Sequence, residues 1–297
     1  MLAIRPGAYA GAVPALRRAA PALAALLAGL AACGGSPAPR PRHAGGAPTR
    51  RHRAAAPLPR APADVRGALA RRMPVPILMY HVVSAAPAGT PNPDLWVGAA
   101  TFAAQMRALR RAGYHAITLT HVFAAWRRGG PLPRRPVVVS FDDGYLSDYT
   151  HARPVLRRLG WPGVLNLELH NVQPGDLTAR QVRGLIAAGW EVDSHTLTHP
   201  DLTTVSDAQL HAELVGSRRE LRRRFGVPAD FFCYPAGRYD GRVVAAVRAA
   251  GYLGATTTRE GYALPTLPYT LARVRVHAGE SAADLLGRLA AERPHTA

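Results

Sequence analysis

The stretch PVVVSFDDGYLSDY, residues 136–149, joins a run of apolar residues to two adjacent carboxylates. An uninterrupted run such as Val-Val-Val is typical of a strand buried on both faces, as in a parallel sheet. The two neighbouring anions at its end repel each other, and burying either one without a partner is costly. We therefore expect a cation beside Asp142 and Asp143, although a solvated turn is the simpler interpretation of FDDG taken alone.

Strand-like and helix-like segments alternate on both sides of this stretch. Three segments have helical periodicity and end at a glycine: 101–113, 177–189 and 206–226. This alternation is typical of a parallel α/β fold, and we expect a barrel. The strand-like runs are VPILMY (75–80), PVVVSF (136–141), GVLNLEL (163–169), WEVDS (190–194), DFFCY (230–234), YLGATT (252–257) and ARVRV (272–276).

The charge of the chain is placed unevenly. Its formal net charge is +18, and all 37 basic residues are arginine. Residues 1–72 hold 12 arginines and one acidic residue, a net +11, whereas the remaining residues hold 25 arginines and 18 acidic residues, a net +7. No basic motif with interleaved aromatic residues accompanies this charge, so we expect no nucleic-acid partner.

The first residues have the pattern of an export signal. Arg5, Arg17 and Arg18 precede an uncharged run over residues 19–32, which is too short to span a bilayer. The run ends in LAAC, which resembles the lipobox of bacterial lipoproteins. We expect a signal peptide over residues 1–32, lipidation of Cys33, and an exported protein anchored by lipid to the extracytoplasmic face of the cell membrane. An ordinary signal peptide is the alternative.

A Pro-, Ala- and Arg-rich segment over residues 33–72 follows this signal, and its composition predicts a disordered tether. The folded domain is expected over residues 73–297. The chain has two cysteines. If Cys33 is lipidated, Cys233 has no partner, and no disulfide is expected.

A second polar motif, WEVDSHTLTHPDL, occupies residues 190–202. His195 and His199 are four residues apart, which in a helical turn places both imidazoles on one side. A structural or surface pair of histidines is the alternative. Together with Asp143 they would supply two nitrogens and one oxygen, the open three-ligand set of a catalytic divalent metal.

Three segments taken together resemble a known family. VVVSFDDGY (137–145), EVDSHTLTHPDL (191–202) and FFCYPAGRYD (231–240) resemble, in this order, the first three motifs of the polysaccharide deacetylase family, the NodB-homology carbohydrate esterases of family 4. VPILMYH (75–81) and AAGYLGATTT (249–258) are similar to the branch that contains poly-N-acetylglucosamine deacetylases. The resemblance covers about residues 75–290.

This resemblance implies a fold, a cofactor and a catalytic base. The fold would be a distorted (β/α) barrel with fewer than eight regular units. Asp143, His195 and His199 would hold Zn²⁺, with Co²⁺ or Ni²⁺ as alternatives, and Asp142 would be the base. General-base chemistry agrees with this assignment, because Asp142 lies outside the ligand set and can take a proton from the attacking water.

The chain departs from the family pattern at its third motif. That motif usually begins with an arginine that pairs with the base, and here Cys233 occupies the place. Tyr234 and Pro235 fit a version of the motif that lacks the arginine, with Ala236 at the expected backbone N–H for the oxyanion. We hypothesise that Arg273 supplies the missing positive charge; a surface residue on an edge strand is the alternative.

The remaining site predictions concern the general acid and the substrate. The family often uses a late histidine after a strand, which suggests His277. His81, Tyr145, Tyr234 and Pro235 are candidates for binding substrate, and Tyr145 could stack on a glycan. For His81 and His277 a hydrogen-bonded loop position is the alternative.

The sequence therefore predicts a monomeric, metal-dependent hydrolase. It would remove N-acetyl or O-acetyl groups from an acetylated polysaccharide of the cell envelope or the extracellular space. The alternative, suggested by the missing arginine, is a catalytically inactive glycan-binding lipoprotein on the same fold.

Overall fold

The computed structural model describes residues 64–292, and eight strands in this part of the chain form one parallel sheet. The order is β1-β8-β7-β6-β5-β4-β3-β2, and β1 also pairs with β3, so seven strands close into a barrel. This confirms the predicted barrel with fewer than eight units. The strands are β1 (Ile77–Tyr80), β2 (His115–Ala116), β3 (Pro136–Asp143), β4 (Val164–Leu167), β5 (Glu191–Ser194), β6 (Phe231–Cys233), β7 (Gly254–Glu260) and β8 (Leu271–Arg275).

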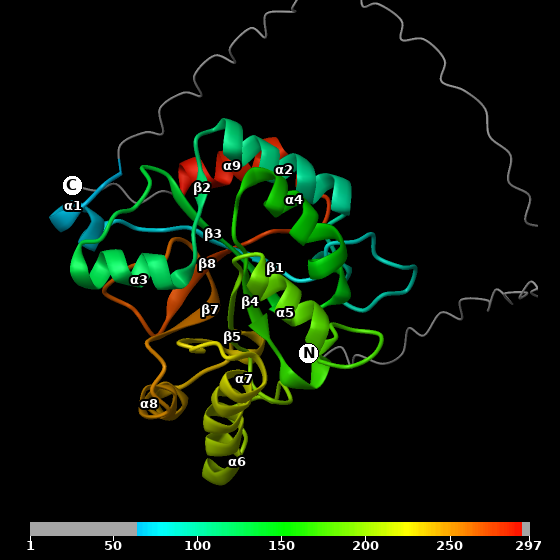
Figure 1. Ribbon diagram of the computed structural model, residues 1–297, viewed down its shortest axis with the longest axis vertical. Coiled ribbons are helices and arrows are strands. Elements are labelled where there is room, and N and C mark those ends of the chain that lie inside the picture. The colour runs from blue at the N-terminus through cyan, green and yellow to red at the C-terminus, as the bar shows by residue number, and fades with distance from the viewer. Residues whose placement is uncertain (1–63, 293–297) are drawn as a thin grey trace, which may run out of the picture. The chain divides into compact units, whose positions relative to one another are not determined.

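Helices lie around the barrel and connect successive strands (Figure 1). In the described residues, α2 packs beside α9 and α1 beside α3. The helices are α1 (Gly67–Arg72), α2 (Ala99–Arg111), α3 (Leu119–Arg128), α4 (Arg153–Leu159), α5 (Ala179–Ala187), α6 (Asp207–His211), α7 (Ser217–Phe225), α8 (Gly241–Ala249) and α9 (Ala282–Ala291).

The helix signals in the sequence correspond to observed helix ends. Thr178 forms a capping box with Gln181 at the start of α5. Ser206 accepts a hydrogen bond from the N–H of Gln209 at the start of α6, and Gly226 ends α7 in the left-handed conformation. The predicted helix over 206–226 is α6 and α7 joined by a π-helical turn. The two-residue strand β2 was not predicted, because it is too short to show a periodicity.

Two layers of apolar side chains hold the barrel together. Strand residues of one parity pack outward against α2, α4, α5 and α9, with the aromatic stack of Phe141 on Trp190 among them. Residues of the other parity come from five strands, and they include Ile77, Val138 and Val164. These residues pack with Phe123 of α3. Side chains from several strands can reach one residue together only in the interior of the barrel, so α3 closes the end of the barrel where the strands begin.

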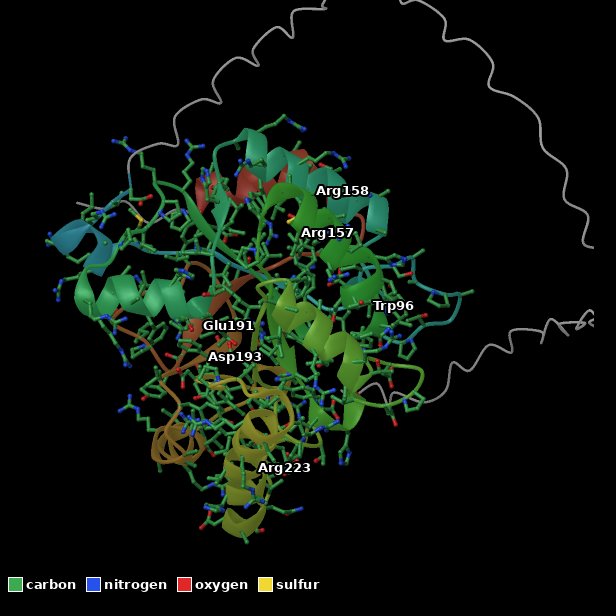
Figure 2. All side chains as sticks on the ribbon, in the orientation of Figure 1. Trp96, Arg157, Arg158, Glu191, Asp193 and Arg223 are labelled. Atoms are coloured by element: carbon green, nitrogen blue, oxygen red, sulfur yellow. The ribbon has the colours of Figure 1, made fainter. Side chains whose placement is uncertain are left out.

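The interior also carries polar groups above this apolar layer. Asp193 is buried on β5 two residues after Glu191, and Figure 2 shows the two side chains next to each other. Glu191 accepts hydrogen bonds from the backbone N–H groups of Leu119 and Thr120, at the N-terminus of α3. The carboxylate of Glu191 therefore ties β5 to the helix that closes the barrel.

The folded part of the chain begins before residue 73. Val65 pairs with Leu132 through two backbone hydrogen bonds, and Ala70 of α1 is fully buried. The segment from Asp64 to Arg72, which the sequence assigns to the tether, is therefore structured. The predicted signal peptide, Cys33, the rest of the predicted tether and residues 293–297 lie outside the described residues.

No helix within residues 64–292 combines the length and the apolar character that crossing a membrane requires.

Candidate active site

A pocket of about 470 Å³ opens at the carboxyl ends of the barrel strands. Parallel α/β folds place their reactive groups at this end, because the loops that follow the strands meet there. Asp142 and Asp143 end β3, and His195 and His199 follow β5. All four residues line the pocket.

Asp142 is buried and paired with a buried guanidinium. The two nitrogens Nη1 and Nη2 of Arg273 donate to its two carboxylate oxygens, each at 2.7 Å, and Asn166 Nδ2 donates to Oδ1 at 2.8 Å. Arg273 has no exposed surface, so it is not an edge-strand surface residue. Burial alone would raise the pKa of Asp142, but the Arg273 guanidinium outweighs it and holds that pKa well below its usual range.

Cys233 lies against the same ion pair. Its Sγ is 3.4 Å from Arg273 Nη2 and 3.7 Å from Asp142 Oδ2. The guanidinium of Arg273, carried on β8, thus contacts both Asp142 and the position where the family motif usually has an arginine. The charge that the third motif lacks reaches Asp142 from another strand.

Asp143, His195 and His199 converge on one point. Asp143 Oδ1 lies 3.3 Å from His195 Nε2 and 3.8 Å from His199 Nε2, and one ligand atom from each residue lies within 4.8 Å of the other two. Nδ1 of His195 is hydrogen-bonded at 2.8 Å to the carbonyl oxygen of Cys233, which directs Nε2 toward Asp143. Second partners of this kind fix the ring orientation of metal-ligating histidines.

The two histidines are not on a helical turn as predicted. They stand in an irregular loop in which Thr196 and His199 have positive φ angles of 71° and 54°. Glu213 holds this loop by accepting hydrogen bonds from the backbone N–H groups of Leu197 and Thr198. The loop brings the imidazoles together through these contacts and not through helical periodicity.

Backbone strain gathers at this end of the barrel. Six residues other than glycine have positive φ in the described part of the chain. Four of them, Asn92, Asp143, His199 and Ala236, line the pocket. Such conformations cost about 1–3 kcal/mol each and persist where surrounding contacts enforce them, commonly at functional sites.

Comparisons with known proteins agree with this geometry. Residues 129–255 match the family model described as polysaccharide deacetylase. The Bacillus subtilis (strain 168) protein YxkH, which is classed with that family, is 29% identical over 209 residues that cover 70% of this chain and 73% of YxkH. The match places residues 129–255 in the polysaccharide deacetylase family.

Two further proteins are similar to parts of this chain. The structure of the Streptococcus pyogenes deacetylase PplD in complex with acetate superposes with a TM-score of 0.68 and 26% identity, over 73% of this chain and 98% of PplD. The poly-β-1,6-N-acetyl-D-glucosamine N-deacetylase of Escherichia coli (strain K12) is 45% identical over 56 residues. Those residues are 19% of this chain and only 8% of that enzyme.

The other predicted site residues fall into two groups. Tyr145, Tyr234, Pro235, Ala236 and His81 all line the pocket, and His81 Nε2 lies 3.8 Å from Asp142 Oδ2. Burial, and then the nearby charge of Asp143, raises the pKa of the Tyr145 hydroxyl.

His277 does not belong with them. It is 47% exposed, lies outside the lining of the pocket, and its Nδ1 is 2.8 Å from Asp94 Oδ2. The strand β8 ends at Arg275, and the next residues turn toward the loop that carries Asp94. The structure therefore does not place His277 as a general acid.

Sequence reasoning missed Glu168. This residue follows β4 and lines the pocket beside Asp143, whose carbonyl oxygen accepts its backbone N–H. Burial, and then the nearby charge of Asp143, raises the pKa of Glu168 to about 7. The available signal is a carboxyl group one residue beyond the buried strand, but the sequence pattern places Glu168 within the strand-like run 163–169.

Proposed function

We propose that the protein is a metal-dependent deacetylase that removes N-acetyl groups from an extracytoplasmic polysaccharide. One observation carries the proposal: a carboxylate held ionised by a buried guanidinium lies directly beside a three-residue ligand set in one pocket. The similarity to the Escherichia coli N-deacetylase favours poly-N-acetylglucosamine as the substrate class. The acetate bound in the Streptococcus pyogenes deacetylase is the product that such a reaction releases.

The residues present fit a divalent cation. Asp143, His195 and His199 offer one oxygen and two nitrogens, a donor set that suits Zn²⁺, with Co²⁺ and Ni²⁺ as alternatives. The orientation of His195 by a backbone carbonyl leaves its Nε2 free to bind. A bound divalent cation would polarise the acetyl carbonyl and lower the pKa of the attacking water.

Asp142 is the base in this mechanism. Its low pKa keeps it ionised at neutral pH, so it can accept a proton from the attacking water. Arg273 and Asn166 donate three hydrogen bonds to the carboxylate, which holds the base in one orientation. The backbone N–H of Ala236, on the pocket wall, is the proposed donor to the developing oxyanion.

His81 is the proposed carrier of the proton to the leaving amine. Burial lowers the pKa of its imidazole, so the ring is neutral at neutral pH and can take up the proton from Asp142, 3.8 Å away. This assignment replaces His277.

The proposed location rests on the leader sequence. The apolar run over residues 19–32 and the LAAC sequence favour export and lipidation of Cys33, with the domain held on the extracytoplasmic face of the membrane. Labelling with a radioactive fatty acid in a bacterial host, comparing the native chain with Cys33→Ser, tests this part. Label retained by Cys33→Ser would contradict it.

Acetate release measures the proposed activity. The protein is stripped with a chelator, reloaded with Zn²⁺, Co²⁺ or Ni²⁺, and offered β-1,6-linked N-acetylglucosamine oligomers, chitooligosaccharides and acetylated xylan. We expect acetate from the first substrate, restored by one equivalent of metal and abolished in Asp142→Asn. Metal binding without acetate from any substrate would favour a glycan-binding protein, and release from xylan alone would make the enzyme an O-deacetylase.

A further inference from the structure

The end of the barrel opposite the pocket carries pairs of consecutive arginines. Arg71 and Arg72 end α1, and Arg127 and Arg128 end α3. The two helix ends touch, because Nη1 of Arg71 donates to the carbonyl oxygen of Arg127 at 3.1 Å. All four side chains are exposed.

Two more pairs lie at the same end. Arg110 and Arg111 end α2, and Arg134 and Arg135 stand in the loop that leads into β3. Nη1 of Arg135 donates to the carbonyl oxygen of Ala112 at 2.6 Å, which joins this loop to the end of α2. We call these eight arginines the arginine face. In a parallel barrel the segments that precede the strands share one end, so the arginine face and the pocket mouth lie at opposite ends.

The charge of the arginine face is uncompensated. Segments 65–76, 107–117 and 124–136, which contain it, have no Asp or Glu. None of the eight arginines forms an ion pair with another residue between 64 and 292. Residues 64–292 hold 27 arginines and 19 acidic residues, a net +8, so the local charge of this face equals that of the whole described part.

Helix dipoles explain only part of this arrangement. Cations are favoured in the last turn of a helix, which accounts for one or two arginines per helix. Arg134 and Arg135 are not in a helix, and α5 has no basic residue in its last turn. Consecutive arginines also end α4, at Arg157 and Arg158, and α7, at Arg222–Arg224, so Arg134 and Arg135 are what distinguish the arginine face from these helix ends.

A groove lined by both polar and apolar groups lies within the arginine face. It has a volume of about 440 Å³, and Arg134 and Arg135 lie on its wall beside Met73, Pro74 and Tyr114. Leu69 of α1 also lines it and is 54% exposed. Apolar groups surrounded by arginines suit the boundary between the headgroups and acyl chains of a bilayer.

We propose that the arginine face docks on a bilayer containing anionic phospholipid and directs the pocket away from it. The face complements the charge of such a surface, and the described chain begins beside it, at Asp64, 31 residues after Cys33. Docking adds an orientation to the proposed function and does not depend on catalysis. A tether alone would allow the opening of the pocket to face the lipid.

A probe at each end of the barrel tests the orientation. The full chain with Cys33→Ser is labelled with an environment-sensitive dye at Leu69→Cys or, as the control, at Gln173→Cys on the exposed loop after β4. Cys233 is fully buried, which protects it from the label. With vesicles of phosphatidylglycerol and phosphatidylcholine we expect at least a twofold rise in fluorescence at position 69 and none at position 173. Phosphatidylcholine alone should give neither.

Charge removal tests the cause. Arg111→Gln/Arg128→Gln/Arg134→Gln should weaken partitioning to the anionic vesicles on the order of 100-fold, since each arginine near such a surface is worth about 1 kcal/mol. The matched variant Arg180→Gln/Arg219→Gln/Arg259→Gln removes three exposed arginines that lie outside the arginine face, and it should partition to the vesicles as the native protein does. The leader is common to both proteins, so its contribution cancels. Acetate release in solution should be unchanged in both.

Three outcomes would overturn the proposal. They are no response at position 69, an equal response at position 173, and equal losses in the two triple variants. A response at position 69 to a soluble oligonucleotide but not to vesicles would identify a nucleic-acid surface instead. Because both labelled proteins retain the native arginines, the orientation test holds even if a triple variant fails to fold.

Discussion

Two pairs of carboxyl groups lie in the same barrel, and their surroundings shift their pKa values in opposite directions. Asp142 and Asp143 end β3. Glu191 and Asp193, which Figure 2 labels, lie on β5. Asp142 is buried but receives two hydrogen bonds from the guanidinium of Arg273. The buried positive charge makes the ionised form the stable one.

The β5 pair has no cation within its hydrogen-bonding reach in the described residues. Asp193 Oδ1 accepts only the backbone N–H of Phe231, and burial raises the pKa of Asp193 well above its usual value. Burial also raises the pKa of Glu191, although two backbone N–H groups of α3 favour its ionised form. The surroundings of the pair therefore favour its protonated form, most strongly at Asp193.

The difference teaches that partners, and not residue type or depth, decide which carboxyl group can act as a base. A carboxyl that holds its proton cannot accept another, so Asp193 is structural. Asp142 stays ionised because a buried arginine on β8 pairs with both of its carboxylate oxygens, and an ionised carboxylate can accept a proton. Each prediction below removes one side of this contrast.

Replacing the ionised carboxylate has the largest expected effect. Asp142→Asn keeps the shape of the side chain and removes the base, and we expect acetate release to fall about 10²–10⁴-fold. Metal content should stay near one equivalent, because Asp142 is outside the ligand set. Activity within about tenfold of the native protein would show that another group takes the proton.

Removing the cation should convert Asp142 into a second Asp193. Arg273→Met leaves a buried carboxylate without a partner, and we expect a loss of about 3–5 kcal/mol in the free energy of unfolding at neutral pH. In the native protein the pKa of Asp142 is depressed, so its contribution is present at neutral pH and lost only as pH falls below the unfolded value. In the variant the folded pKa is raised instead. The stability gap between the two proteins should therefore widen from pH 5 to pH 8 in urea unfolding.

A second substitution separates charge from packing in that experiment. Asp142→Asn added to Arg273→Met should recover much of the lost stability, because no buried charge remains. The control Arg259→Gln, at an exposed position, should change stability by less than about 0.5 kcal/mol. If the double variant is as unstable as Arg273→Met, packing and not charge is the cause.

Replacing the protonated carboxyl should have a smaller effect with the opposite dependence on pH. Asp193→Asn imitates the neutral form. In the native protein the raised pKa of Asp193 gives stability that is complete below the unfolded value and is lost as pH rises through the folded value. The free energy of unfolding of the variant should therefore rise relative to that of the native protein, by up to about 1.4 kcal/mol per pH unit, as pH rises above about 4. Unfolding by urea between pH 4 and pH 8 measures this. Parallel curves would mean that Asp193 is ionised in the fold.

The sequence predicted the barrel because each strand and helix has a recognisable pattern within a short stretch of residues. Runs such as PVVVSF, and helices with a capping serine or threonine and a terminal glycine, each reflect short-range physics. It also predicted that Asp143, His195 and His199 would converge, since the ends of parallel strands meet at one end of the fold. Their roles as metal ligands stay a prediction.

Contacts between residues far apart in the chain are only weakly indicated by the sequence. The pairing of Arg273 with Asp142 joins residues 131 positions apart, and only the missing arginine at Cys233 pointed to it. The helical turn predicted for His195 and His199 was wrong because Glu213, beyond the motif, fixes the loop. The place of His277 depends on Asp94, 183 residues away, for which the sequence offers no signal.

His277 supplies the smallest expected effect. Its imidazole is half exposed and touches Asp94, an exposed pair worth about 0–1 kcal/mol. We expect His277→Ala to change kcat for acetate release by less than about twofold, whereas His81→Ala should lower it on the order of 100-fold if His81 carries the proton. His81 lines the pocket and His277 does not, so measuring both variants at saturating metal separates a catalytic imidazole from a surface one. A large loss in His277→Ala with His81→Ala unaffected would restore the role that the late strand motif suggests.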